Sequence, residues 1–479
     1  MTEQASGLKK VTFTAFLLFA ACLGLVVVQP GNHTSDKIPP RIAAYQKNIS
    51  ALVKYLTAGS GQGQGWEWLA NLTDSFGHRH IGSSGFTSAL VYTQALLKKQ
   101  GFDNVHLESV EGLPNWRRGR EEAFLLQPRR HRLSLLGVGG TGPTPRGGLA
   151  AEAVVVRSFK EAEALGRKGK IKGKILVFNQ PWITYGVSVA YRSAAATSIQ
   201  YGAIATLIRS VTSFSVYSPH TGMGADSSQG TAIPSACITV EDAELLWRMQ
   251  QRGQKLRIHL LITSAAHGTL TSYNQIFELK GRERPNEVVL LSGHFDSWDV
   301  GTGAMDDGGG IAVMWAAAKA IKALGLPLKR TIRVIFWTAE EQGHLGAAYY
   351  HKVHSTWRNE SFFFVSESDM GVFRPRSKNA SMLTRTKSAA LLQRLQDVSQ
   401  VLDSLQIPIS VTNSTHDLGD AEPWAKEGVP GFVYMNMDTY NKYFVFHHTN
   451  ADTMSVLAKD DIDYTAAVFA SFAYVLANL

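Results

Sequence analysis

EVVLLSGHFDSWDVGTGAMDDGGG, residues 287–310, is the stretch that decides the predicted fold. It begins with a continuous apolar run typical of a buried strand, and its last glycines open residues 308–325, whose apolar content predicts a helix. Similar apolar runs recur further along, at residues 331–339, 361–368 and 431–436. Continuous apolar strands that alternate with helices predict an α/β fold, in which helices cover both faces of a mixed, mainly parallel sheet.

The rest of the chain divides into parts by its apolar pattern. Residues 51–115 are mainly helical in pattern, because apolar residues recur at three- and four-residue spacing up to Gln100. Residues 116–271 carry short apolar runs broken by turns, which predict a smaller, β-rich inserted domain with one or two helices. We therefore predict that residues 51–115 and 272–479 form one main domain, which the insert interrupts.

The N-terminal residues have the pattern of an export signal. Lys9 and Lys10 precede an apolar run from Val11 to Val28, so residues 1–28 are interpreted as a signal peptide or a signal anchor. Cleavage is favoured, because the run is short for a membrane span. A lipoprotein acylation site at Cys22 is a third option, but six N-x-[ST] sequons, typical of a glycosylated exported protein, argue against it.

Charge and cysteine content narrow the class of protein further. The net charge is +9, but the basic residues are scattered and accompany no recognisable nucleic-acid module, so we expect a solvated surface and no nucleic-acid partner. Cys22 and Cys237 are the only cysteines, so a chain cleaved after the export segment would have no internal disulfide. Small and apolar neighbours predict that Cys237 is a buried structural thiol.

Acidic and histidine side chains follow each predicted strand. In open α/β sheets, functional sites gather at the carboxyl ends of the strands, where such side chains would meet. The residues at these positions are His294, Asp296, Asp306, Asp307, Glu340, Glu341, Glu367, Asp369, His447 and His448.

A metal centre explains this concentration of charge. Carboxylates that converge without a cation repel one another and raise each other's pKa, which costs stability. Two imidazoles with at least three carboxylates fit zinc, and less specifically manganese or cobalt. Five ligands exceed the needs of one tetrahedral zinc ion and suit two ions, about 3.5–4 Å apart, that share a bridging carboxylate.

The adjacent glutamates Glu340 and Glu341 fit two different roles in such a centre. One can ligate a metal ion while the other acts as the general base for an attacking water molecule. Because neighbouring strand residues point to opposite sides, we expect the strand to end before this pair. A ligating His294 also needs an acceptor for its second ring nitrogen, and the His-x-Asp spacing predicts that Asp296 supplies it.

The segments GHFDSWDVGTGAMDDGGGIAV, TAEEQG, ESD and FHHTNADT resemble, in order and spacing, the co-catalytic zinc peptidases of family M28. The insert resembles the protease-associated domain found in part of that family. The resemblance implies two zinc ions, one on His294 and Asp369 and the other on Glu341 and His448, although which ion takes Glu341 and which Asp369 stays open. It also implies that Asp306 bridges the ions, that a cis peptide follows this residue, and that Glu340 is the general base. His447 is then a neighbour and no ligand.

The family resemblance also implies a substrate class and a biological setting. We expect an exopeptidase that hydrolyses small peptides, most of all dipeptides with free termini. We also expect it to be secreted or lysosomal, or membrane-anchored if the N-terminal segment is retained, and to form a homodimer. Residues 29–50 are interpreted as a possible propeptide or linker.

Two other functions remain open on the same fold. One is a broader aminopeptidase, and the other is a catalytically silent receptor or binding module. The chain has no H-E-x-x-H and no G-x-S-x-G motif, and GVGGTG at residues 137–142 lacks the following helix that a dinucleotide site needs. We interpret His78 and His80 as structural, and expect the loop with His416 and Asp417 to lie near the substrate.

Overall fold

The computed structural model describes residues 39–224, 233–355 and 359–479. The predicted export segment, residues 1–28, lies outside the described residues. Among the helices that are described, none is long and apolar enough to cross a membrane.

The main domain is built on an eight-stranded mixed sheet with the order β1-β10-β12-β11-β13-β16-β14-β15. Its four central strands, β12, β11, β13 and β16, run parallel to one another. Three pairs are antiparallel: β1 with β10, β10 with β12, and β14 with β16. The α/β fold with a mixed, mainly parallel sheet is therefore confirmed. The strands are β1 (Asp103–Arg117), β10 (Ala265–Leu279), β11 (Arg284–His294), β12 (Arg330–Trp337), β13 (Ser361–Glu367), β14 (Ala380–Arg385), β15 (Ser410–Asn413) and β16 (Gly431–Asn436).

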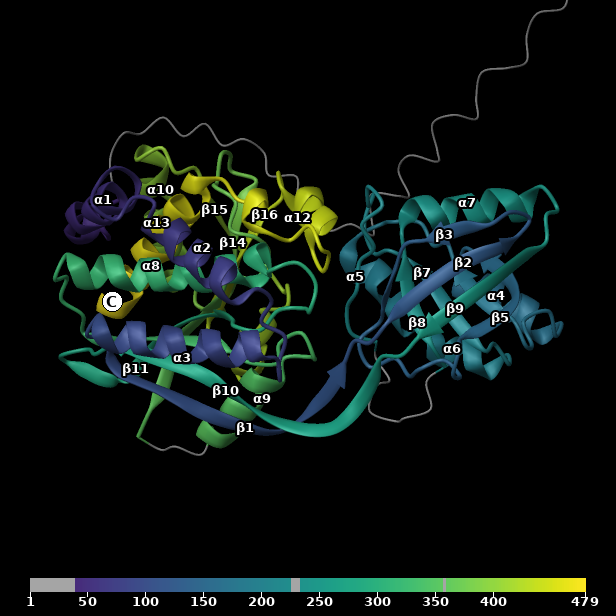
Figure 1. The fold of residues 1–479 in the computed structure, drawn as a ribbon. Coiled ribbons are helices and arrows are strands. Elements are labelled where there is room, and N and C mark those ends of the chain that lie inside the picture. The colour runs from purple at the N-terminus through teal and green to yellow at the C-terminus, as the bar shows by residue number, and fades with distance from the viewer. Residues whose placement is uncertain (1–38, 225–232, 356–358) are drawn as a thin grey trace, which may run out of the picture. The chain divides into compact units, whose positions relative to one another are not determined.

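Helices cover both faces of this sheet (Figure 1). Successive side chains of a strand point to opposite faces, and accordingly Val289 and Leu291 of β11 join one apolar cluster while Leu290 joins the other. Helix α13 (Lys459–Asn478) is buried along most of its length, and it is apolar for most of its sequence after Thr465. The first face is covered by α1 (Ala43–Ala58), α2 (Gln64–Phe76), α3 (Ser84–Lys99), α8 (Gly309–Ala323), α10 (Ala389–Ser404) and α13 (Lys459–Asn478), and the second by α9 (Leu345–His354) and α11 (Glu422–Lys426).

The insert has its own eight-stranded sheet, which lies between residues 121 and 262. The described residues of the insert form four α-helices, more than the one or two that the sequence predicted. The missed helices are short and mark their starts by side-chain caps: Ser158 caps α4 (Phe159–Arg167) and Thr239 caps α7 (Val240–Gln251). The others are α5 (Tyr185–Ser188) and α6 (Ala194–Gln200), and the strands are β2 (Glu121–Gln127), β3 (His131–Leu133), β4 (Leu135–Gly137), β5 (Leu149–Val156), β6 (Ile175–Phe178), β7 (Ala205–Arg209), β8 (Ser235–Ile238) and β9 (Leu256–Ile262).

Two long strands connect the main domain and the insert. Strands β1 and β10 pair antiparallel from Asp103 opposite Glu278 to Arg117 opposite Ala265. One end of this ribbon is an edge of the main sheet, and the other end leads into β2 and out of β9. The chain therefore leaves and re-enters the main domain along one paired element.

Helix α1 begins at Ala43, inside the segment that we interpreted as a possible propeptide or linker. Ile49 is fully buried and belongs to the core cluster that also contains residues of α13. Removal of the chain up to residue 50 would therefore take away half of a helix that packs in the core of the main domain.

Candidate active site

The carboxyl ends of the parallel strands bring the predicted site residues together. His294 ends β11, Glu340 and Glu341 follow the end of β12, and Asp369 follows the end of β13. The turn after β12 contains Ala339 with a φ of 57°, so the strand ends before the glutamate pair as expected. His447 and His448 come directly after α12 (Tyr440–Phe446).

Asp306 lies between two imidazoles. Its Oδ1 is 3.2 Å from Nε2 of His294, and its Oδ2 is 3.2 Å from Nε2 of His448. Asp369 Oδ1 lies 3.3 Å from the same nitrogen of His294, and Glu341 Oε2 lies 3.0 Å from that of His448. The five predicted ligands therefore form two groups that share Asp306. The peptide bond between Asp306 and Asp307 is cis, as the family resemblance implies.

Backbone carbonyls fix the orientation of both imidazoles. Nδ1 of His294 donates to the carbonyl oxygen of Asp296 at 2.9 Å, and Nδ1 of His448 donates to that of Thr221 at 3.2 Å. Since each Nδ1 donates to a carbonyl, Nε2 is the nitrogen of each ring that faces Asp306 and, once deprotonated, the one that could bind a metal ion.

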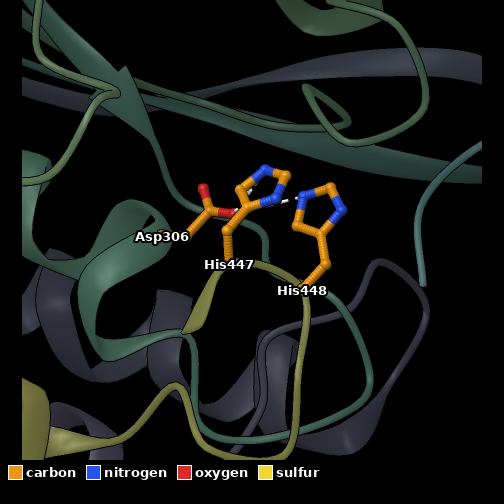
Figure 2. A group of neighbouring side chains, drawn as sticks. All are labelled: Asp306, His447 and His448. Atoms are coloured by element: carbon orange, nitrogen blue, oxygen red, sulfur yellow. Dashed lines mark ion pairs between the residues drawn. The ribbon is translucent and has the colours of Figure 1, made fainter. Parts of the chain in front are cut away.

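The side chain of His447 also lies beside Asp306, next to that of His448 (Figure 2). Its Nε2 is 3.5 Å from Asp306 Oδ2, and its ring stacks on that of His448 with centroids 3.5 Å apart. Its buried Nδ1, however, has no hydrogen-bond partner among the described residues, so nothing there selects the tautomer that His294 and His448 adopt. This difference favours His448 over His447 as the ligand.

Asp296 contacts His294 differently from the predicted way. The imidazole bonds its backbone carbonyl, while its carboxylate lies 3.9 Å from Nδ1. The carboxylate instead accepts the backbone N–H groups of Glu340 and Glu341, at 3.2 and 3.3 Å. Burial raises the pKa of Asp296 to about 6. Asp296 therefore supports both the histidine and the turn that carries the glutamate pair.

Asp307 and Asp299, for which the sequence indicates no role beyond turn geometry, both stabilise the loop between His294 and Asp306. Asp307 accepts backbone N–H groups from His294 and Gly310, each at 3.0 Å. Asp299 forms an ion pair with Arg118 at 2.9 Å.

Sequence reasoning missed two further residues that hold this loop. Asp452 accepts the N–H groups of Met305 and Asp306 at 2.7 and 3.1 Å, and burial, with the nearby charge of Asp306, raises its pKa to about 7. The fully buried Arg79 donates to backbone carbonyls of the loop. Asp452 belongs to the FHHTNADT segment and could have been found there, whereas contacts to backbone carbonyls leave no sequence pattern.

The electrostatics of the group call for additional positive charge. Burial raises the pKa of Glu340, Glu341 and Asp369 above the ordinary carboxyl values. Burial lowers the pKa of His294, but the charges of Glu340 and Asp369 outweigh burial and raise this pKa well above its usual value. Oε1 of Glu341 is buried with no hydrogen-bond donor among the described residues. A cation bound among these oxygens would relieve both the repulsion and the unpaired acceptor, so the donor set fits metal ions.

A cavity of about 470 Å³ opens onto this group. Glu340, with its side chain 14% exposed, lies on its wall, and His344 Nδ1 is 3.2 Å from Glu340 Oε1. His416 and Asp417 also line it, as expected for a loop near the substrate. The insert contributes to the same wall through Tyr185, Gly186, Val189, Arg192 and Met223.

Comparisons with known proteins agree with this geometry. Residues 274–473 match the profile of peptidase family M28. Carboxypeptidase Q of Bos taurus is 41% identical over 453 residues, which cover 94% of this chain and 93% of that protein. Carboxypeptidase Q of Homo sapiens is 40% identical over 466 residues, or 96% of each chain. The chain belongs to peptidase family M28.

Solved structures of the M28 fold extend this result. A peptidase M28 precursor from Shewanella amazonensis SB2B aligns with a TM-score of 0.82 and 31% identity, over 91% of this chain and 97% of that one. A zinc aminopeptidase from Bacillus subtilis shares the fold with a TM-score of 0.64, at 22% identity, over 86% and 95% of the two chains. This M28 protein is a metallopeptidase, which confirms the prediction at that level.

Proposed function

We propose that this protein is a di-zinc exopeptidase that hydrolyses small peptides, most of all dipeptides with free termini. The observation that carries the proposal is the position of Asp306 between the Nε2 atoms of His294 and His448, each ring held by a backbone carbonyl. A silent binding module on this fold would have no need for two oriented imidazoles around a shared carboxylate.

Five side chains would hold the metal ions. His294 and Asp369 form one group, Glu341 and His448 form the other, and Asp306 belongs to both. Zinc ions bound here would polarise the scissile carbonyl and make a water molecule nucleophilic near neutral pH.

Glu340 is the group that would move the proton. Its carboxylate lines the cavity and lies 3.8 Å from His294 Nε2, next to the two ligand groups. Burial raises its pKa, which suits a carboxylate that takes a proton from water and returns it to the leaving amine. A cavity of about 470 Å³ is of the size that encloses a small ligand, which supports short peptides as substrates.

The decisive experiment replaces Glu340 by glutamine and measures dipeptide hydrolysis together with bound zinc. General acid–base catalysis contributes roughly 10²–10⁴-fold, so we expect kcat to fall by about that factor while the zinc content stays at that of the wild type. Glu111→Gln, an exposed position on β1, is the matched control and should change neither quantity. Unchanged hydrolysis by Glu340→Gln would refute the role of the base, and a wild-type chain that binds no zinc would refute the whole proposal.

We also propose that the chain enters the secretory pathway and forms a homodimer. The sequons and the N-terminal segment support export, and the family resemblance supports dimerisation. Mass spectrometry of the mature N-terminus and light scattering of the purified protein test these two points. A mature chain that begins at Met1 and carries no glycan at any sequon would refute export, and a monomer at micromolar concentration would refute dimerisation.

A further inference from the structure

A second cavity, of about 450 Å³, lies among the helices that cover the first face of the main sheet. None of the proposed metal ligands lines it. One face of α2 forms part of its wall, where Gln64, Glu67, Trp68 and Asn71 follow the i, i+3, i+4 and i+7 spacing of neighbours on a helix. Helix α2 packs against α3 and α8 (Figure 1), and these helices and the start of α13 complete the wall.

The wall of this cavity is aromatic. Trp68 stacks on Trp315 of α8 with ring centroids 5.3 Å apart, and Trp66 lines the cavity beside them. The ammonium groups of Lys319 and Lys459 lie over the rings of Trp315 and Trp66, 4.5 and 5.1 Å from the ring centroids. The cavity therefore combines flat apolar surface with groups that can donate hydrogen bonds.

Two indole N–H groups of the cavity residues are unpaired. Nε1 of Trp66 and Nε1 of Trp68 are buried without a hydrogen-bond partner in the described part of the chain. In contrast, Nε1 of Trp315 donates to Gln100 Oε1 at 2.9 Å. A buried indole N–H usually has an acceptor, and leaving it unpaired costs free energy. The occupant that fits this cavity has an apolar face and oxygen atoms that accept hydrogen bonds.

Asn71 links the cavity to an N-glycosylation sequon. It begins the sequon Asn71-Leu72-Thr73, and it is exposed at the wall of the cavity. Its Nδ2 donates to the carbonyl of Glu67 at 2.7 Å, which uses one of the two amide hydrogens. A glycan replaces only one amide hydrogen, so the other is available for attachment. Burial of Thr73 is no obstacle, because the sugar is transferred to the growing chain before it folds.

The other sequons lie elsewhere. None of the remaining sequon asparagines among the described residues lines this cavity: Asn48, Asn359, Asn379 and Asn413. The amide of Asn48 donates to the Tyr474 hydroxyl, which ties it to α13. Asn413 is exposed at the end of β15, so a glycan there would extend into solvent. Asn413 therefore provides the comparison for Asn71.

The first sugar of an N-linked glycan, N-acetylglucosamine, has the chemistry that the cavity requires. The C–H groups on one face of its ring pack against an aromatic ring, and its acetamide carbonyl and hydroxyl oxygens accept hydrogen bonds from indole and ammonium groups. A sugar attached at the rim also has a high effective concentration in the cavity, so weak contacts suffice to hold it there.

We propose that Asn71 carries an N-linked glycan whose first N-acetylglucosamine lies in this cavity, against Trp66 and Trp68. The inference rests on the export proposed above and is independent of the peptidase activity. It assigns the cavity a covalently attached occupant, which covers the tryptophan rings and accepts from their unpaired N–H groups.

The test uses the full-length chain secreted from eukaryotic cells. Mass spectrometry of its glycopeptides should find Asn71 modified. A peptide N-glycosidase must reach the first sugar, and two hydrogen bonds with a stacking contact favour the bound sugar by roughly tenfold or more. We therefore expect the native protein to lose the Asn71 glycan at least about tenfold more slowly than heat-denatured protein does, and more slowly than it loses a glycan at Asn413.

Trp66→Leu removes one aromatic wall and should accelerate release of the Asn71 glycan from the native protein, with no effect at Asn413. Trp247→Leu is the matched control, because Trp247 is also half-buried and has an arginine, Arg157, over its ring at 5.6 Å. It lies on α7 of the insert and does not line this cavity, so its variant should release the glycan at the wild-type rate.

The wild-type protein supports the same test if Trp66→Leu is not secreted. Each glycan is trimmed to a single N-acetylglucosamine whose acetyl methyl group carries ¹³C. Ring currents of the tryptophans should shift the methyl resonance at Asn71 upfield in the native protein and leave it at the free-sugar position after denaturation. A native methyl resonance at the free-sugar position would place the sugar outside the cavity and overturn the inference.

The outcomes separate this inference from the proposed export. If other sequons carry glycans while Asn71 is unmodified, the inference is wrong and export stands. The same holds if wild-type protein and Trp66→Leu release the Asn71 glycan equally fast. If no sequon is modified and the mature chain begins at Met1, export is refuted and the inference fails with it.

Discussion

Replacing Arg79 by methionine should destabilise the loop that carries His294 and Asp306. The Arg79 side chain is fully buried, and it donates to the carbonyls of Phe295, Thr302 and Gly303 at 2.7, 2.9 and 2.9 Å. Methionine fills a similar volume but donates no hydrogen bond.

The expected magnitude follows from these three bonds. A hydrogen bond to a charged group contributes about 1.5–3 kcal/mol, but removing the buried guanidinium also removes its desolvation cost. We therefore expect a loss of about 3–5 kcal/mol in the free energy of unfolding, below the sum of the three bonds. Because second-sphere partners typically affect metal affinity by about 10–100-fold, zinc should also bind more weakly by a factor in that range.

Urea denaturation followed by fluorescence, and zinc titration with a chromophoric chelator, measure the two effects. Arg120→Met is the control, because Arg120 is 69% exposed and pairs with Glu122 at the surface, where an ion pair contributes less than about 1 kcal/mol. If Arg79→Met unfolds at the same urea concentration as Arg120→Met and binds zinc as tightly as the wild type, the loop does not depend on Arg79 and the reasoning fails.

Two further predictions concern regions away from the metal group. Although burial opposes it, hydrogen bonds from His106 and His354 lower the pKa of Glu108 to about 2 from an ordinary 4.5, and Glu108 raises the pKa of His106. The lowered pKa of Glu108 contributes stability that is present above pH 4.5 and lost as the pH falls toward 2. The raised pKa of His106 contributes stability that is present below pH 6.5 and lost as the pH rises above that value. Glu108→Gln should therefore lower the free energy of unfolding most between pH 4.5 and 6.5, by about 1–2 kcal/mol after allowance for solvent screening, and an equal loss at pH 9 would contradict this assignment. Burial raises the pKa of Cys237 to about 11, so a thiol reagent at pH 8 should label the native protein negligibly and the urea-unfolded protein fully, and rapid native labelling would show that the thiol is accessible.

The central sheet and most proposed ligands could be predicted because one physical rule links them. Strands buried on both faces are continuous apolar runs, and parallel strands present their carboxyl ends at one edge. The residues after β11, β12 and β13 were therefore candidates before any contact was known. Short elements gave no such signal: β15 has four residues and α11 has five, too few for a period to be recognised.

The supporting contacts could not be predicted, because they join backbone atoms to residues far away in the sequence. Arg79 bonds carbonyls more than 200 positions away, and the acceptor of the His448 imidazole is the carbonyl of Thr221 in the insert. A carbonyl oxygen is present in every residue, so no residue type marks these acceptors. Arg192 was likewise inconspicuous in sequence, since only its burial and its unpaired nitrogens distinguish it from a surface arginine.

Arg118 links the insert to both groups of proposed metal ligands, the one with His294 and the one with His448. Arg118 follows the end of β1, where the paired ribbon enters the insert, and its guanidinium bonds Asp299 in the loop between His294 and Asp306. The same guanidinium donates to the Thr221 hydroxyl at 3.2 Å, and the carbonyl of Thr221 orients His448. A shift of the insert relative to this loop would therefore disturb His448, a proposed metal ligand, as well as Tyr185 and Arg192 on the cavity wall. The proposed metal site and the cavity wall thus depend on the same contacts between the main domain and the insert.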